Sequence, residues 1–220
     1  MQLPAGWEEA LRYLGAAEAP EPLRRQAEAV WDKLTADLRP TFVFRVFDLE
    51  FVPEGVRFAG ANVLLTGTTA ARMLKNCRRG ALLACTLGSR FDLALLALQA
   101  RDMAQAALYD ACGSAYVEEG CGMAEEALSA RLPGLYLTDR FSPGYGDLPL
   151  DVQGDLCAAL DARRRLGLTV TESALLNPVK SVTAVIGIAE TPQPARIRGC
   201  GYCLMRDTCL LRKGGNHCGN

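Results

Sequence analysis

The chain has 220 residues, a formal net charge of −1 and hydrophobic residues at half of its positions. A chain with so little net charge has no strong field for nucleic acid or an anionic membrane, so we expect neither as a partner. The first residues contain no signal-like apolar core, and the apolar runs are shorter than a membrane span. We therefore expect a soluble cytoplasmic protein.

The first part of the chain is predicted to form helices before and between short strands. Apolar residues recur at helical spacing in 22–38, and aromatic and β-branched residues dominate 41–47. We expect a short helix or turn at 6–14, and helices at 22–38 and from a cap at Thr66–Thr68 to about 76. The expected strands are 41–47, 56–58, 62–65 and 81–87.

The second part is predicted to be more helical. We expect a long helix from 90 to about 119 that Gly120 and Gly122 break, then helices at 123–131 and 152–165 and strands at 135–137, 168–171 and 182–188. Asp151 is the expected N-cap of helix 152–165, and Gly167 its C′ residue. Because strands and helices do not alternate strictly, the fold class is α+β, a twisted, largely antiparallel sheet with flanking helices.

The loop 139–150 carries two prolines, two glycines and two aromatic residues. Pro143-Gly144 predicts a type II turn in which Gly144 adopts a positive φ. Arg140 offers donors that suit a carboxylate or phosphate, and Tyr145 offers a flat ring with a polar tip. These groups suit a small zwitterionic or nucleoside-like ligand, and the alternative is an ordinary surface turn.

Common catalytic signatures are absent from the sequence. It contains no P-loop and no Gly-x-Gly-x-x-Gly fingerprint, and its one histidine, His217, lies near the end. A self-contained hydrolase would have to use that histidine. We therefore expect a protein that binds a reactive ligand.

A second motif, Thr169 to Val182, joins two predicted strands through a polar turn that contains Pro178. This motif and the loop Arg140–Gly146, in this order and about thirty residues apart, resemble the activation (reactivation) domain of cobalamin (vitamin B12)-dependent methionine synthase. The likeness covers about 110–188. Thr86-Leu87-Gly88, with the helix through Asp102 and Asp110, looks like the free-standing versions of that domain.

The chain departs from that family at several positions. Gly146 stands where the family usually has proline, which suggests a looser end of the loop, and Ala174-Leu175-Leu176 replaces an Ala-Met pattern. A family glutamate is replaced by Ser114, and Glu118 is one turn further along. An aromatic segment that follows the second motif in the larger enzyme is missing.

The resemblance implies binding of S-adenosylmethionine beside a corrinoid, and reductive methylation of cob(II)alamin. It implies that Tyr145 acts as the catalytic residue, flanking the ligand or facing the corrin. The ligand-binding residues that it implies are Arg140, Phe141, Ser142, Gly144, Tyr145, Gly146, Glu118 and Glu172.

The resemblance also implies a partner, because the chain is too short to carry its own cobalamin domain. That partner is a corrinoid-binding methionine synthase without its own activation domain, served by an electron donor such as flavodoxin or ferredoxin. Two alternatives stay open: a structural or regulatory adaptor that binds zinc, and a free-standing methyltransferase that acts on a small molecule.

Four of the nine cysteines crowd the last 21 residues: Cys200, Cys203, Cys209 and Cys218. This density predicts a metal site, and the redox role favours an iron–sulfur cluster over zinc, with free thiols as the third possibility. We expect an activation-like domain at 1–190, which includes N-terminal helices within 1–40, and a metal-binding tail at 191–220. The remaining five cysteines are expected to be reduced and buried.

Overall fold

The computed structural model describes residues 6–194, which form helices and a largely antiparallel sheet, so the predicted α+β class is confirmed. The described residues divide into two compact units that alternate along the chain. The first unit comprises 6–43, 84–125 and 162–182, and the second comprises 44–83, 126–161 and 183–194.

The first unit is mostly helical. Its elements are α1 (Gly6–Tyr13), α2 (Glu21–Asp37), α4 (Ser89–Gln99), α5 (Met103–Ala130) up to Glu125, α7 (Ala162–Leu166) and the hairpin of β6 (Thr169–Val170) and β7 (Leu176–Asn177). Leu11 of α1, Ala27 of α2 and Leu108 of α5 form one buried cluster. The ring of Trp31 meets the ring of Tyr116 edge-on at 5.4 Å between centroids. These contacts pack α1 and α2 against α5.

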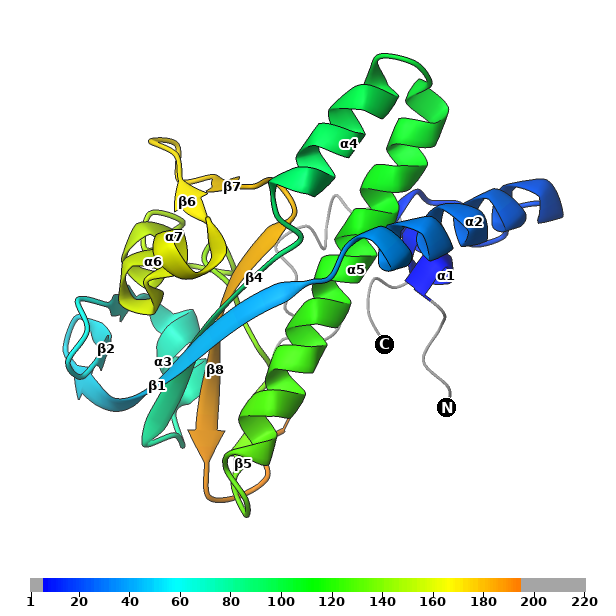
Figure 1. Ribbon diagram of the computed structural model, residues 1–220. Coiled ribbons are helices and arrows are strands. Elements are labelled where there is room, and N and C mark those ends of the chain that lie inside the picture. The colour runs from blue at the N-terminus through cyan, green and yellow to red at the C-terminus, as the bar shows by residue number, and fades with distance from the viewer. Residues whose placement is uncertain (1–5, 195–220) are drawn as a thin grey trace. The chain divides into compact units, whose positions relative to one another are not determined.

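The predicted position of the helix break was wrong. The chain turns at residues 100–102, and α5 then runs through Gly120 and Gly122 without a break. Asp102 makes this restart possible, because its carboxylate accepts a hydrogen bond from Gln105 N at 3.0 Å, as an N-cap does. Figure 1 shows α4 folded back beside the first half of α5, and the rings of Phe91 and Tyr109 stack between them at 4.7 Å.

Close packing explains why α5 contains a glycine at position 120. A Cβ atom there would lie 2.5 Å from Pro40 Cβ and 2.7 Å from Cys85 Sγ. Both distances are shorter than any ordinary van der Waals contact, so only glycine lets the helix approach these neighbours. Tertiary packing therefore outweighs the poor intrinsic helix propensity of this residue.

The second unit holds most of a six-stranded sheet in the order β3-β2-β1-β4-β8-β5, with α3 (Thr68–Leu74) and α6 (Gln153–Leu160). The strands are β1 (Thr41–Val52), β2 (Gly55–Phe58), β3 (Leu64–Thr66), β4 (Arg79–Thr86), β5 (Tyr136–Leu137) and β8 (Ser181–Ala189). β1 pairs antiparallel with β2, as β2 does with β3 and β5 with β8. β4 and β8 are buried along most of their length, as their apolar sequences predict.

The predicted helix 152–165 is two helices in the structure. Asp161 adopts a left-handed conformation, with φ of 53°, and this residue ends α6 before α7 begins. Aspartate tolerates that conformation better than most residues. The N-cap of α6 is Val152, not the predicted Asp151, whereas Gly167 follows α7 with a positive φ as expected.

Several sequence expectations concern burial and the membrane. The five cysteines within residues 6–194, Cys77, Cys85, Cys112, Cys121 and Cys157, are buried free thiols, as predicted. Over the same residues no helix is long and apolar enough to span a bilayer. The tail cysteines lie outside the described part of the chain.

Candidate functional site

The loop 139–150 belongs to the second unit and runs from β5 to α6. Its first half is fixed to β8. Phe141 is fully buried, its amide donates to Val185 O at 3.0 Å, and its carbonyl accepts from Val185 N at 2.7 Å. Thr138 N likewise donates to Gly187 O at 2.9 Å. Phe141 therefore anchors the loop through its ring and its backbone.

The centre of the loop forms the predicted type II turn. Tyr145 N donates to Ser142 O at 3.1 Å, and Gly144 at the third position of the turn has φ of 88°. Gly144 N in turn donates to Leu148 O at 3.0 Å. The turn lifts Tyr145, whose side chain is 50 % exposed, while Arg140 remains half-buried at the start of the loop.

The far end of the loop is tied to the start of α3 by Asp147. Asp147 Oδ2 accepts hydrogen bonds from Thr68 N at 2.6 Å and from Thr68 Oγ1 at 2.7 Å. Asp147 Oδ1 accepts one from Thr69 N at 2.8 Å, and Asp147 N donates to Thr69 Oγ1 at 3.4 Å. Asp147 thus supplies the cap that Gly67, the N-cap residue of α3, cannot provide from its own side chain.

These hydrogen bonds favour the ionised carboxylate. Bonds from Thr69 and then from Thr68 hold the pKa of Asp147 well below its usual value. An ionised carboxylate accepts hydrogen bonds at both oxygens and donates none, which matches the three donors that it faces.

Two glycines with positive φ let these segments approach. A Cβ atom at Gly67 would lie 2.8 Å from Asp147 Cγ, and one at Gly146 would lie 2.3 Å from Thr69 Oγ1. Gly146 has φ of 59°, which a proline cannot adopt. The end of the loop is therefore held by its neighbours, Thr69 among them.

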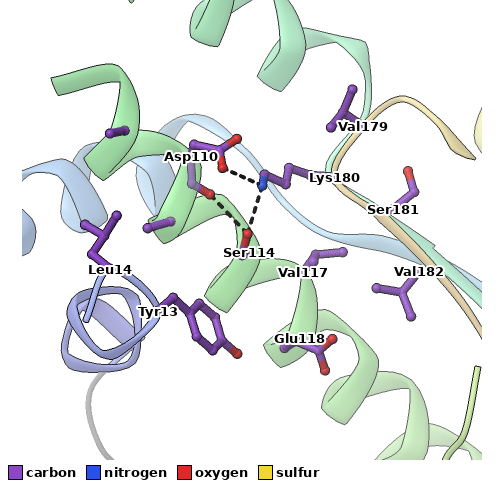
Figure 2. A pocket seen from close by; sticks show the side chains of 12 residues that line it. Tyr13, Leu14, Asp110, Ser114, Val117, Glu118, Val179, Lys180, Ser181 and Val182 are labelled. Atoms are coloured by element: carbon purple, nitrogen blue, oxygen red, sulfur yellow. Dashed lines mark hydrogen bonds and ion pairs between the residues drawn. The ribbon is translucent and has the colours of Figure 1, made fainter. Parts of the chain in front are cut away.

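A pocket of about 570 Å³ lies in the first unit, and Figure 2 shows the side chains around it. Its lining residues come from the end of α1 and the residue after it, from α5, and from the start of β8 with the two residues before it: Tyr13, Leu14, Ala107, Asp110, Ala111, Ser114, Val117, Glu118, Val179, Lys180, Ser181 and Val182.

Lys180 organises one side of this pocket. Its ammonium donates to Asp110 Oδ2 at 2.9 Å and to Ser114 Oγ at 2.8 Å. The hydroxyl of Ser114 donates to the carbonyl oxygen of Asp110 at 3.2 Å. Ser114 is thus part of a hydrogen-bond network with a lysine.

The other side of the pocket carries Glu118 and Tyr13, which Figure 2 shows beside each other. Burial, and then the negative charges of Glu9 and Glu118, raise the pKa of Tyr13 above its usual value. The phenol therefore stays neutral at physiological pH and can both donate and accept a hydrogen bond.

The predicted site residues fall in both units. The loop residues Arg140, Phe141, Ser142, Gly144, Tyr145 and Gly146 belong to the second unit. Glu118 and Glu172 belong to the first, but only Glu118 lines the pocket described above. Glu172 is exposed in the turn that joins β6 to β7.

Asp147 of the loop 139–150 and Lys180 of the second motif had no predicted role. The signal for Asp147 was indirect: Gly67, the residue before the Thr68-Thr69 pair of α3, has no side chain to cap that helix. The partner that caps it lies 79 residues away, and no local pattern identifies it.

No metal site is evident within residues 6–194, where no three His, Cys, Asp or Glu side chains are placed to hold an ion. The predicted metal ligands Cys200, Cys203, Cys209 and Cys218 all lie outside the described residues. That expectation stays a prediction.

Taken together, the fold defines an α+β domain with an open, largely antiparallel sheet and flanking helices. Among solved structures, the chain is similar to the MetH reactivation domain bound to AdoHcy, with a TM-score of 0.60 and 18 % sequence identity. The match covers 98 % of this chain and 78 % of that one. The fold is thus that of the MetH reactivation domain, as the two motifs predicted. Neither a family model nor a curated protein sequence matches the chain.

Proposed function

We propose that this chain binds S-adenosylmethionine at the loop 139–150 and supports the reductive methylation of cob(II)alamin on a separate methionine synthase. The observation that carries the proposal is the turn itself. Its ordered backbone presents an exposed tyrosine ring a few residues after a half-buried arginine, on a fold that binds AdoHcy in the MetH reactivation domain. AdoHcy is S-adenosylmethionine without its transferable methyl group.

The chemistry of the loop matches the parts of such a ligand. A guanidinium pairs with a carboxylate through two parallel hydrogen bonds, so Arg140 would hold the amino-acid end. An aromatic face stacks on a flat base, so Tyr145 would flank the adenine or face the corrin. Gly144, where a Cβ atom would have no neighbour closer than 3.6 Å, leaves the backbone open to close approach.

The corrinoid would be a substrate carried by the partner protein. After reduction by one electron it would accept the methyl group of the sulfonium, whose S–CH₃ bond breaks so that S-adenosylhomocysteine leaves. The residues of this chain would bind and orient the sulfonium ligand. The electron would come from a separate donor such as flavodoxin or ferredoxin.

Glu118 and Glu172 are proposed as acids for the ligand ammonium. Glu118 is proposed from the sequence, and within the first unit it lines a pocket with Tyr13. Glu172 is supported only by its place in the second motif. The proposed cytoplasmic setting and the boundary of the activation-like domain at residue 190 rest on the sequence.

The tail is proposed to hold one metal centre through Cys200, Cys203, Cys209 and Cys218. Four thiols at this density favour an iron–sulfur cluster if the protein takes part in electron delivery, and zinc if the tail is structural.

Methyl transfer tests the proposal against a free-standing methyltransferase. The protein would be incubated with S-adenosylmethionine, a reductant and a methionine synthase that carries cob(II)alamin but no activation domain. Methylated corrinoid should form only when all components are present. Methylation of a small acceptor without any corrinoid would favour the alternative.

A further inference from the structure

We propose that Asp147 is a positioning residue for the ligand loop, and that its carboxylate holds Tyr145 and Gly146 in the conformation that binds the ligand. This inference rests on the proposed function. Asp147 lies two residues after Tyr145, and its contacts with Thr68 and Thr69 bind the loop to the start of α3.

The contact between the two segments consists of four hydrogen bonds. Both carboxylate oxygens of Asp147 accept hydrogen bonds, from Thr68 through its amide and hydroxyl and from Thr69 through its amide. The amide of Asp147 donates back to the hydroxyl of Thr69. A reciprocal set of this kind fixes the orientation of the backbone at residue 147 as well as its position.

The loop needs such a tie because its own sequence is permissive. Gly144 and Gly146 both adopt positive φ, and glycine visits many other conformations at little cost. Phe141 holds the first half of the loop through Val185, but it lies on the other side of the turn. Without the contact to α3, the segment around Tyr145 would sample other conformations, and ordering it would weaken binding.

Glycines at positions 67 and 146 allow the loop and the start of α3 to approach each other closely. A side chain at Gly67 would collide with the carboxylate of Asp147, and one at Gly146 would collide with the hydroxyl of Thr69. Both segments thus carry a glycine where the other segment meets them. This complementarity favours a dedicated contact over a chance surface hydrogen bond.

A residue that only capped and stabilised α3 would make most of the same contacts. The experiment must therefore separate stabilisation of α3 from positioning of the ligand loop. Asp147→Asn is the decisive variant, since it keeps the size of the side chain but replaces one acceptor oxygen by an NH₂ group. That group would face the backbone N–H of Thr68 or of Thr69, which can only donate, so the hydrogen bond from that amide would be lost.

Leu82→Val is the matched control. Leu82 is fully buried in β4 of the same unit, so this change lowers stability by removing one methylene group from the core. It changes no residue of the loop or of α3. Urea denaturation would measure the loss of stability in both variants.

The readouts are calorimetric binding of AdoHcy and hydrogen exchange of the amides of Gly144, Tyr145 and Leu148, each of which is bonded within the loop. In Asp147→Asn these amides should exchange faster than in the wild type. If the competent conformation falls to about a tenth of the population, the dissociation constant should rise roughly tenfold. Leu82→Val should bind within about twofold of the wild type at a comparable loss of stability.

Asp147→Glu and Thr68→Ser add a graded test. Thr68→Ser keeps the hydroxyl and should bind AdoHcy nearly as tightly as the wild type. Asp147→Glu displaces the carboxylate and should bind AdoHcy more weakly. Equal binding and unchanged loop exchange in Asp147→Asn would overturn the inference. So would an effect on binding no larger than that of Leu82→Val.

Failure of the proposed function would look different. A wild-type protein that does not bind AdoHcy would contradict ligand binding itself. Loop exchange in Asp147→Asn would still report whether the carboxylate orders the loop in the free protein.

Discussion

The ammonium of Lys180 lies 2.9 Å from Oδ2 of Asp110, and this ion pair joins the residue that precedes β8 to the middle of α5. The lysine side chain is only 13 % exposed, whereas the aspartate is 44 % exposed. Because water screens one partner, the attraction between the two charges should be modest.

A double-mutant cycle with Lys180→Met and Asp110→Asn should measure that contribution. We expect a coupling energy of about 0.5–1 kcal/mol in the free energy of unfolding, since a partly exposed ion pair gives this order of stabilisation. Each variant would be unfolded in urea. Strict additivity of the two substitutions would contradict a direct interaction.

Two glycines of α5 form a matched pair for the packing argument. Gly120→Ala should destabilise the protein by about 1–3 kcal/mol, because its Cβ would collide with Pro40 and Cys85. Gly122→Ala meets no atom within 4 Å and should stabilise by about 0.5–1 kcal/mol through higher helix propensity. Equal effects of both changes, measured by denaturation, would be inconsistent with a continuous, closely packed α5.

These glycines also show where sequence patterns were insufficient. Their low helix propensity predicted a break at 120–122, but propensity is a local quantity and the partners of Gly120 come from distant segments. Apolar residues at helical spacing, in contrast, located α2, and the continuous apolar run at 81–87 located β4, because burial determines those two elements directly.

In the candidate site, too, the local structure was predictable from the sequence and the long-range contact was not. The dipeptide Pro143-Gly144 alone determines the type II turn, and the structure confirms it. The role of Asp147 was not predictable, since its partners Thr68 and Thr69 precede it by 79 and 78 residues. Side-chain contacts between segments that distant leave no periodic trace in a single sequence.

The contribution of Asp147 to stability should depend on pH. Its pKa is lowered in the folded protein, so the carboxylate stabilises the fold fully above the pKa of the unfolded chain, and this stabilisation is lost as the pH falls toward the folded pKa. The stability difference between wild type and Asp147→Asn should thus be constant from pH 7 to about 5 and shrink below about 4.

Urea denaturation of both proteins across that range would measure this difference. The sign is informative, because a carboxylate with a raised pKa would show the opposite trend. A difference that grows as the pH falls would contradict the hydrogen bonds from Thr68 and Thr69.

The tail should bind metal through its four cysteines. Protein purified without air should be brown, with the broad absorbance that iron–sulfur clusters show near about 400 nm. Cys203→Ser should remove the colour and leave ligand binding unchanged, since the loop lies about sixty residues earlier in the sequence.

Metal analysis decides between the remaining possibilities. Colourless protein with stoichiometric zinc would retain the metal site and exclude the redox role. Metal-free protein with four alkylatable tail thiols would exclude both.

Calorimetric titration of the whole protein with S-adenosylmethionine, beside Arg140→Ala, tests ligand binding at the loop most directly. The wild type should bind saturably, and Arg140→Ala should lose about 1.5–3 kcal/mol of binding free energy through one charge-assisted contact. Arg78→Ala, in the same unit but outside the loop, should bind like the wild type. No binding by the folded wild type, or equal binding by Arg140→Ala, would contradict a ligand site at this loop.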